Sequence, residues 1–94
     1  MSKEIFDFVS IQLNKNHKTA LYVQLYDEIR EMIISGKLSH GFLLPPVRKL
    51  AKFLEINAGT VMSAYKLLEQ NGYIFIFLRV TDKRFNRFCT LSNK

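Results

Sequence analysis

The stretch EINAGTVMSAYKLLEQNGY, residues 55–73, decides the fold because it contains one helix with both of its ends marked. Asn57 is of a residue type that caps helix N-termini, and Gly72 suits the left-handed position that follows a helix. Between them, apolar residues recur at helical spacing and predict one inward face, formed by Val61, Ala64, Tyr65 and Leu68. We therefore expect a helix over about residues 58–71.

The segment LLPPVRKLAKFLEI, residues 43–56, predicts a shorter helix directly before this one. Pro46 fits the first helical position, where the N–H that proline lacks would have no partner. Its apolar face comprises Val47, Leu50, Ala51 and Leu54. Two short helices joined by the tight turn EINAG have the pattern of a helix-turn-helix.

A third helix is predicted upstream, over about residues 19–35, with Thr19 as its N-cap and Gly36 just after its end. Its inward face should comprise Leu21, Tyr22, Leu25, Tyr26, Ile29, Met32 and Ile33. Residues 1–18 combine strand-like pieces with the polar run NKNHK. We interpret them as an N-terminal arm or edge strand followed by a linker.

The C-terminal part of the chain predicts a β-hairpin. The segment YIFIFLRV, residues 73–80, is almost continuously apolar, which predicts a strand covered on both faces. The segment TDKR, residues 81–84, is a polar turn, and FNRFCTL, residues 85–91, is the returning strand. Three helices followed by a hairpin predict a mainly α protein with the winged helix-turn-helix fold over residues 19–94.

The charge of the chain favours an anionic partner. The 94 residues carry a net charge of +6, which points first to nucleic acid and second to a membrane surface. Residues 79–94 hold five Lys or Arg against one acid, whereas residues 1–78 hold nine against seven. The predicted hairpin and tail should therefore be the most basic part of the molecule.

Membrane and secreted classes are disfavoured. No apolar run approaches the roughly 20 residues of a membrane span. Lys3, Glu4 and Asp7 interrupt any signal-peptide core. The single cysteine, Cys89, cannot form an intramolecular disulfide, which fits a reducing cytoplasm. We expect a cytoplasmic protein without membrane association.

Catalytic and metal-binding patterns are missing from the sequence. His17 and His40 stand in predicted loops, with no further Cys or His at ligand spacing. The sequence shows no glycine-rich phosphate loop, no Ser–His–Asp set and no paired carboxylates in a protected pocket. We expect no metal, no cofactor and no enzymatic activity.

The motifs LYVQLYDEIREMIISGKL, LLPPVRKLA and NAGTVMSAYKLLEQNGYI, in this order and spacing, resemble the GntR family of bacterial transcription regulators. The resemblance covers about residues 20–74 and implies a homodimer that binds double-stranded operator DNA. The segment FVSIQLNKNHKTALYVQLY looks most like the MocR-type subgroup, which adds a pyridoxal-phosphate-binding, aminotransferase-like domain. The YtrA-type subgroup, with two C-terminal dimerisation helices, is the other candidate. Neither effector module fits within 94 residues, so no effector function is carried over.

The chain departs from the family pattern at two places. Family members often have an Arg at the position of Ala58, where it reaches a base or a phosphate. They also usually have a glycine-rich wing after the residues that match Gly72 and Tyr73, whereas residues 75–94 contain no Gly. The first departure weakens direct base readout, and the second affects the minor-groove contact of the wing.

Arg48 is the strongest single candidate for DNA contact. It follows the Pro45–Pro46 turn, and the resemblance implies an Arg on DNA at this position. Its planar guanidinium suits a phosphate or a guanine. The neighbouring Lys49 supplies general electrostatic attraction or only solvates its helix.

The first turn of the predicted second helix of the motif offers Asn57, Gly59 and Thr60. A helix N-terminus has unpaired N–H groups and a positive dipole end, so it binds phosphate without a cationic side chain. Gly59 lets the backbone come close to a ligand. Asn57 is a cap, a DNA contact, or both.

Further candidates lie outward on the same helix and in the hairpin. Ser63 and Lys66 suit phosphate contact. A basic hairpin tip would meet the minor groove or phosphates, or would form only a solvated turn. The residues concerned are Arg79, Lys83 and Arg84.

Two other interpretations stay open. In the first, the chain is a winged-helix protein-interaction module that binds DNA weakly. The lack of an Arg at position 58 favours this interpretation, and so does the apolar run over residues 73–78, because an apolar strand can pair with another chain. Alternatively, the part from Phe75 onward is the remnant of a longer regulator that was cut short or altered.

Overall fold

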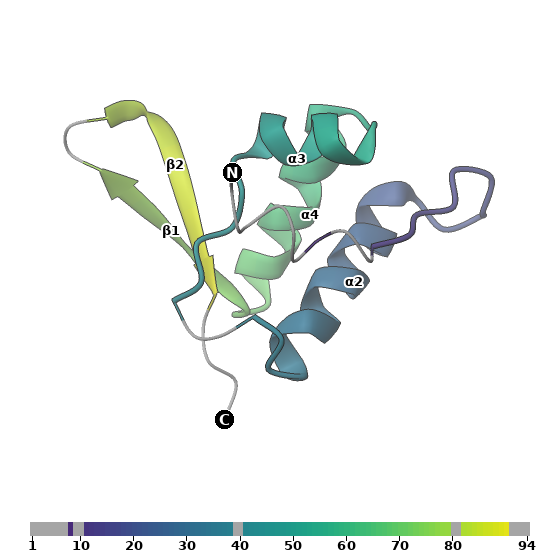
Figure 1. Ribbon diagram of the computed structural model, residues 1–94, viewed down its shortest axis with the longest axis horizontal. Coiled ribbons are helices and arrows are strands. Elements are labelled where there is room, and N and C mark those ends of the chain that lie inside the picture. The colour runs from purple at the N-terminus through teal and green to yellow at the C-terminus, as the bar shows by residue number, and fades with distance from the viewer. Residues whose placement is uncertain (1–7, 9–10, 39–40, 80–81, 91–94) are drawn as a thin grey trace.

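The computed structural model describes residues 8, 11–38, 41–79 and 82–90, with side chains described as far as Phe75. Its elements are α2 (Leu21–Ile34), α3 (Val47–Leu54), α4 (Ala58–Gln70), β1 (Ile74–Arg79) and β2 (Asp82–Thr90). Helix α4 lies between α2 and the β1–β2 hairpin, with α3 near one of its ends (Figure 1). The predicted mainly α architecture with a two-stranded wing is confirmed.

Helix α2 begins one position later than the sequence predicts. Ala20 occupies the N-cap position, and no side chain caps the helix there. Thr19 is not the cap because the first helical hydrogen bonds, from the N–H groups of Val23 and Gln24 at 3.1 Å, go to the carbonyl oxygen of Ala20. The carbonyl oxygen of Thr19 accepts instead from the side chain of Gln24, from Nε2 at 2.7 Å. Thr19 therefore belongs to the loop that precedes the helix.

The inward face of α2 is narrower than predicted. Its buried residues are Leu25, Ile29, Met32 and Ile33. Tyr22, in the first turn, is 40% exposed. Beyond the helix, Gly36 has a φ of 86°, as expected for a left-handed residue that ends a helix.

Helix α3 also differs from the prediction at its start. Pro46 takes the N-cap position and not the first helical one, because its ψ of 148° is extended. Its carbonyl oxygen still accepts the first helical hydrogen bond, from the N–H of Leu50 at 3.0 Å. At the other end, Glu55 is left-handed with a φ of 59°, a conformation that costs a non-glycine residue about 1–2 kcal/mol.

A buried hydrogen bond joins the two helices of the motif. The hydroxyl of Tyr65 on α4 donates to the carbonyl oxygen of Pro45 at 2.7 Å. Both residues are almost completely buried. The residue that leads into α3 is thereby tied to the middle of α4. The predicted inward face of α4 is confirmed, since its buried residues are Val61, Ala64, Tyr65 and Leu68.

Part of the segment expected to be an arm or linker packs on the domain. Phe8 and Ile11 are buried in the core that the helices form. The ring of Phe8 lies 6.5 Å from the ring of Phe42, measured between centroids. Residues 8 and 11–18, the described part of this segment, form no strand.

The hairpin is antiparallel, and its register pairs Ile74 with Thr90 and Arg79 with Asp82. The second strand therefore begins at Asp82, so the prediction of a turn over residues 81–84 is wrong for its last three residues. An irregularity between Leu78 and Arg79 shifts the register next to the turn. Of the described strand side chains, Ile74 is 1% exposed and Phe75 is 38% exposed. This end of β1 is thus covered on one face and not on both.

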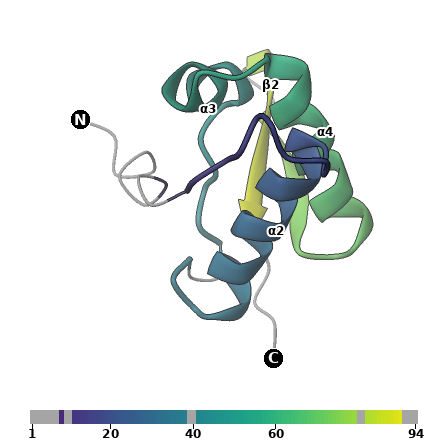
Figure 2. The same ribbon diagram turned by 90° about the vertical axis from the view of Figure 1, so that its right-hand side faces the viewer.

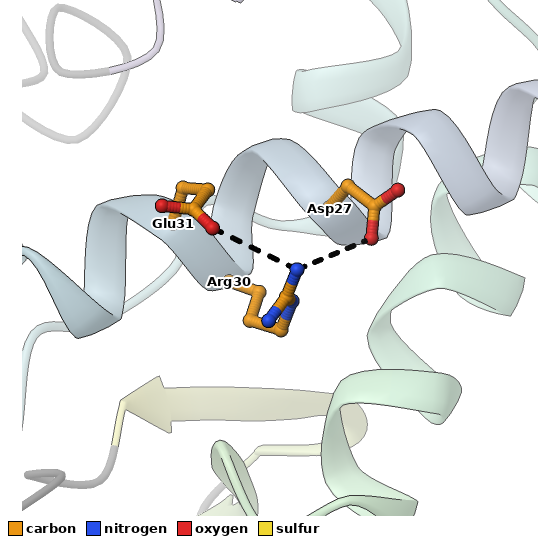
Figure 3. Close-up of polar contacts among 3 residues, drawn as sticks. All are labelled: Asp27, Arg30 and Glu31. Atoms are coloured by element: carbon orange, nitrogen blue, oxygen red, sulfur yellow. Dashed lines mark ion pairs between the residues drawn. The ribbon is translucent and has the colours of Figure 1, made fainter.

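The residue that leads into β1 is held against α2. The rings of Tyr26 and Tyr73 meet edge to face at a centroid distance of 6.3 Å, and the guanidinium of Arg30 lies 5.9 Å from the Tyr26 ring. Arg30 also pairs with Asp27 and Glu31 at 3.8 and 3.7 Å (Figure 3). The hydrogen bond that Arg30 donates to the Tyr73 side chain raises the pKa of Arg30, and the charges of Tyr73, Glu31 and Asp27 add to this effect. The base of the wing is thereby anchored to α2.

The Tyr65–Pro45 bond generates a stability prediction. Tyr65→Phe should lower the free energy of unfolding by about 1–3 kcal/mol, because the Pro45 carbonyl would stay buried without this donor. Urea denaturation followed by circular dichroism measures the change. Tyr22→Phe, which removes a hydroxyl from an exposed side chain, is the matched control and should change stability by less than about 0.5 kcal/mol. Equal effects of the two substitutions would contradict the role given to the buried bond.

Candidate nucleic-acid interface

The first turn of α4 is capped from within. Asn57 Oδ1 accepts a 2.8 Å hydrogen bond from the N–H of Gly59, which confirms Asn57 as the N-cap. A Cβ at Gly59 would lie 3.2 Å from this oxygen and would crowd the cap. The glycine therefore preserves the cap and leaves the backbone of the first turn uncovered. Together with the positive end of the helix dipole, this turn has the chemistry of an anion site.

The outward face of α4 carries three of the predicted contact residues. Gly59, Ser63 and Lys66 are all exposed, and their spacing of four and three residues places them on one side of the helix. Thr60 is half-buried at the border of this face. The buried residues of α4 occupy the opposite side. The structure therefore leaves this set available to a partner.

Helix α3 adds cations beside this face. Arg48 and Lys49, in its first turn, are exposed, and Lys52 is exposed one turn later. Within the described part of the chain, the ion pairs between side chains are those that Arg30 makes. The cations of α3 and α4 are thus not neutralised by a described acidic side chain. They can attract phosphates, and the electrostatic attraction of exposed charges falls with added salt.

The structure gives the backbone positions of the three hairpin candidates. Arg79 lies in β1, and Lys83 and Arg84 lie in β2. Their side chains lie outside the described residues. The backbone register brings Arg79 opposite Asp82 at the tip.

Sequence reasoning missed a basic loop that precedes α2. The Lys15 ammonium donates a 2.9 Å hydrogen bond to the carbonyl oxygen of Glu55, in the turn between α3 and α4. Lys15 and Lys18 are exposed. The only local signal was the basic composition of NKNHK, because the contact joins residues 40 positions apart.

Among the described residues, no group of three or more His, Cys, Asp or Glu side chains is placed to hold a metal ion. No helix in the described ranges is both long and apolar enough to pass through a bilayer.

Comparison with known proteins identifies the family. Residues 21–80, more than half of the chain, match the family described as "Bacterial regulatory proteins, gntR family". The HTH-type transcriptional repressor YtrA of Bacillus subtilis is 38% identical over 64 residues, which are 68% of this chain and 49% of that protein. The probable rhizopine catabolism regulatory protein MocR of Rhizobium meliloti is 32% identical over 62 residues, which are 66% of this chain and 13% of that protein.

A solved structure shows the same likeness in three dimensions. YtrA from Sulfolobus acidocaldarius, a GntR-family transcription factor, matches with a TM-score of 0.77 and 34% identity, covering 89% of this chain and 82% of that one. The chain spans about half or less of the length of the two curated relatives. The matching segment contains α2, α3, α4 and β1, which are the elements that build the candidate interface. The chain therefore belongs to the gntR family of bacterial regulatory proteins, a family of DNA-binding transcription regulators.

Proposed function

We propose that this protein regulates transcription by binding double-stranded operator DNA through α3 and α4. The observation that carries the proposal is the uncovered first turn of α4 beside the exposed cations of α3. In a helix-turn-helix, the first turn of the second helix enters the major groove and the first helix of the motif lies against the backbone. The described geometry fits this arrangement.

Each residue of the interface has a role that its chemistry supports. Arg48 binds a phosphate or a guanine through its planar fork, and Lys49 adds attraction to the backbone. The amides of the first α4 turn, together with Gly59, hold a phosphate at close range. Thr60 contacts a thymine methyl or a phosphate, while Ser63 and Lys66 contact phosphates further along the groove.

The proposal extends to assembly and location. A homodimer would bind a palindrome-like operator with half-sites about 34 Å apart, one turn of the duplex. The relatives, which include a transcriptional repressor and a GntR-family transcription factor, support the regulatory role. We place the protein in the cytoplasm, where the DNA of a bacterium lies. The wing residues Arg79, Lys83 and Arg84 remain candidates for contacts in the flanking minor groove.

A protein-interaction module is the second candidate function, favoured by one observation. Phe75 is 38% exposed on β1, and the first turn of α4 has no cationic side chain. An exposed aromatic residue on a two-stranded sheet suits contact with another chain. Selection of bound duplexes from a random pool separates the candidates. An enriched palindrome supports the operator function, whereas an unenriched pool together with a stable dimer in light scattering supports the second.

The operator function predicts strong salt dependence. If Arg48, Lys49 and Lys66 of both protomers contact phosphates, a plot of log affinity against log salt should have a slope of about −5. Fluorescence anisotropy titrations of the selected duplex between low and high salt measure the slope. An affinity that is the same at both ends of the salt range would rule out a phosphate-dominated interface.

If the Arg48 guanidinium contacts the backbone, Arg48→Ala should weaken binding to selected and unselected duplexes alike, by about 1–3 kcal/mol, because a phosphate contact does not depend on sequence. Anisotropy titration at fixed salt measures this change. Lys37→Ala removes a positive charge from the turn after α2, at the end of α2 that is far from α3 in both views (Figures 1 and 2). This control should leave the affinity nearly unchanged, and the same result for Arg48→Ala would remove Arg48 from the interface.

Two substitutions of Asn57 distinguish its role as a helix cap from a role in DNA contact. Asn57→Ala should destabilise the fold by about 1 kcal/mol, because the N–H of Gly59 loses its acceptor. Asn57→Asp keeps an acceptor and should keep the stability, yet weaken DNA binding about tenfold or more, since its charge would face phosphates. Gln70→Glu adds the same charge at the far end of α4 and serves as the control. Thermal melts and anisotropy titrations measure the two effects. If Asn57→Asp and Gln70→Glu bind DNA equally well, this turn does not face the duplex.

A further inference from the structure

We propose that the loop of residues 14–18, which precedes α2, is a second phosphate-binding element that flanks the helix-turn-helix. The inference rests on the proposed operator function and extends it to a segment that the sequence alone presented as a linker. Three observations carry it: where the loop is attached, how it is held, and what charge it carries.

The loop is attached to the turn that positions the DNA-reading helix. Lys15 Nζ donates to the carbonyl oxygen of Glu55 at 2.9 Å. Glu55 is the left-handed residue that ends α3, and Asn57, the cap of α4, follows two residues later. Figures 1 and 2 show the loop at the end of the molecule that carries α3, away from the turn after α2. Any duplex that receives the first turn of α4 therefore passes close to this loop.

The shape of the loop is held by hydrogen bonds to one side chain of α2. Gln24 Oε1 accepts from the N–H of Asn14 at 2.8 Å, and Gln24 Nε2 donates to the carbonyl oxygens of Asn14 at 3.0 Å and Thr19 at 2.7 Å. Within the loop, the N–H of Asn16 donates to Asn14 Oδ1 at 2.9 Å. A loop that is already ordered loses less conformational entropy when it binds. Gln24 thus preorganises the loop for a partner.

The loop presents positive charge and polar donors to solvent. Lys15 and Lys18 are exposed, and residues 14–20, NKNHKTA, contain no acidic residue. The carbonyl oxygen of Glu55 accepts from Lys15, and among the described residues no ion pair joins the Glu55 carboxylate to this ammonium. An ammonium that donates once keeps two further protons for another acceptor. A row of phosphates fits this surface.

The spacing of the cations matches a duplex. Arg48 lies in the first turn of α3 and Glu55 ends this helix, so the rise of α3 between them separates the two cationic sites by about 10 Å. The major groove of B-DNA is about 12 Å wide. Arg48 and the 14–18 loop can therefore approach the backbones on the two sides of the groove that receives α4. The loop supplies cations near a first turn that has Ala58 in place of a basic residue.

The test compares variants that lose the same charge at different places. On the duplex selected by the wild-type chain, Lys18→Gln should weaken binding about fivefold at 150 mM salt and make the log–log salt slope shallower by about one per protomer. The double variant Lys15→Gln/Lys18→Gln should double the change in slope. Lys37→Gln, at the far end of α2, is the matched control and should behave like the wild type. Circular dichroism melts establish that each variant is folded.

The outcomes separate this inference from the proposed function. If Arg48→Ala weakens binding while Lys18→Gln and the double variant match Lys37→Gln, the loop does not contact DNA and the operator function stands. If the wild-type chain shows no salt-dependent binding to any duplex, the operator function itself fails. Phosphate-ethylation interference provides a second readout. Interference at one or two phosphates should disappear in the double variant, and an unchanged pattern would overturn the inference.

Discussion

The buried hydrogen bond from the Tyr65 hydroxyl to the Pro45 carbonyl oxygen is the contact on which the geometry of this domain depends. It joins the middle of α4 to the residue that leads into α3. An apolar core alone would tolerate some sliding between two short helices, whereas a buried polar pair needs one geometry to stay satisfied. The bond therefore sets where Arg48 stands relative to the first turn of α4. The same constraint places the Glu55 turn, and with it the loop that Lys15 attaches there.

The distribution of charge around α4 follows from its neutral first turn. No acidic or basic side chain occupies that turn, and Asn57 caps it through its own side chain. Backbone N–H groups and the helix dipole can hold an anion there, but they supply less long-range attraction than full charges. The nearby exposed cations lie instead outside this turn, at Arg48 and Lys49 on α3, at Lys66 further along α4, and at Lys15 and Lys18 before α2. In this arrangement the cations outside the first turn supply the long-range attraction, and the first turn of α4 brings its backbone close to the DNA.

The segment before α2 is part of the domain because it packs on the core and is held by hydrogen bonds. Phe8 and Ile11 contribute to the core, and Gln24 and Glu55 hold the loop that follows. Tyr26 and Arg30 of α2 likewise contact Tyr73 and anchor the base of the wing. Helix α2 is therefore the scaffold between an N-terminal loop and a C-terminal hairpin, in addition to being a core helix.

Features that depend on a few neighbouring residues could be predicted from the chain alone. The cap at Asn57, the stops at Gly36 and Gly72 and the buried face of α4 follow from local conformational preference and helical periodicity, so the family fold could be predicted from the sequence, as could the face of α4 that stays exposed. The predictions for Thr19, Pro46 and the start of β2 were wrong by one to three residues, because local preferences are similar at adjacent positions. The left-handed Glu55 and its bond to Lys15 required the tertiary structure. Forty residues separate those partners, and only the packing of α2, α3 and α4 brings them together.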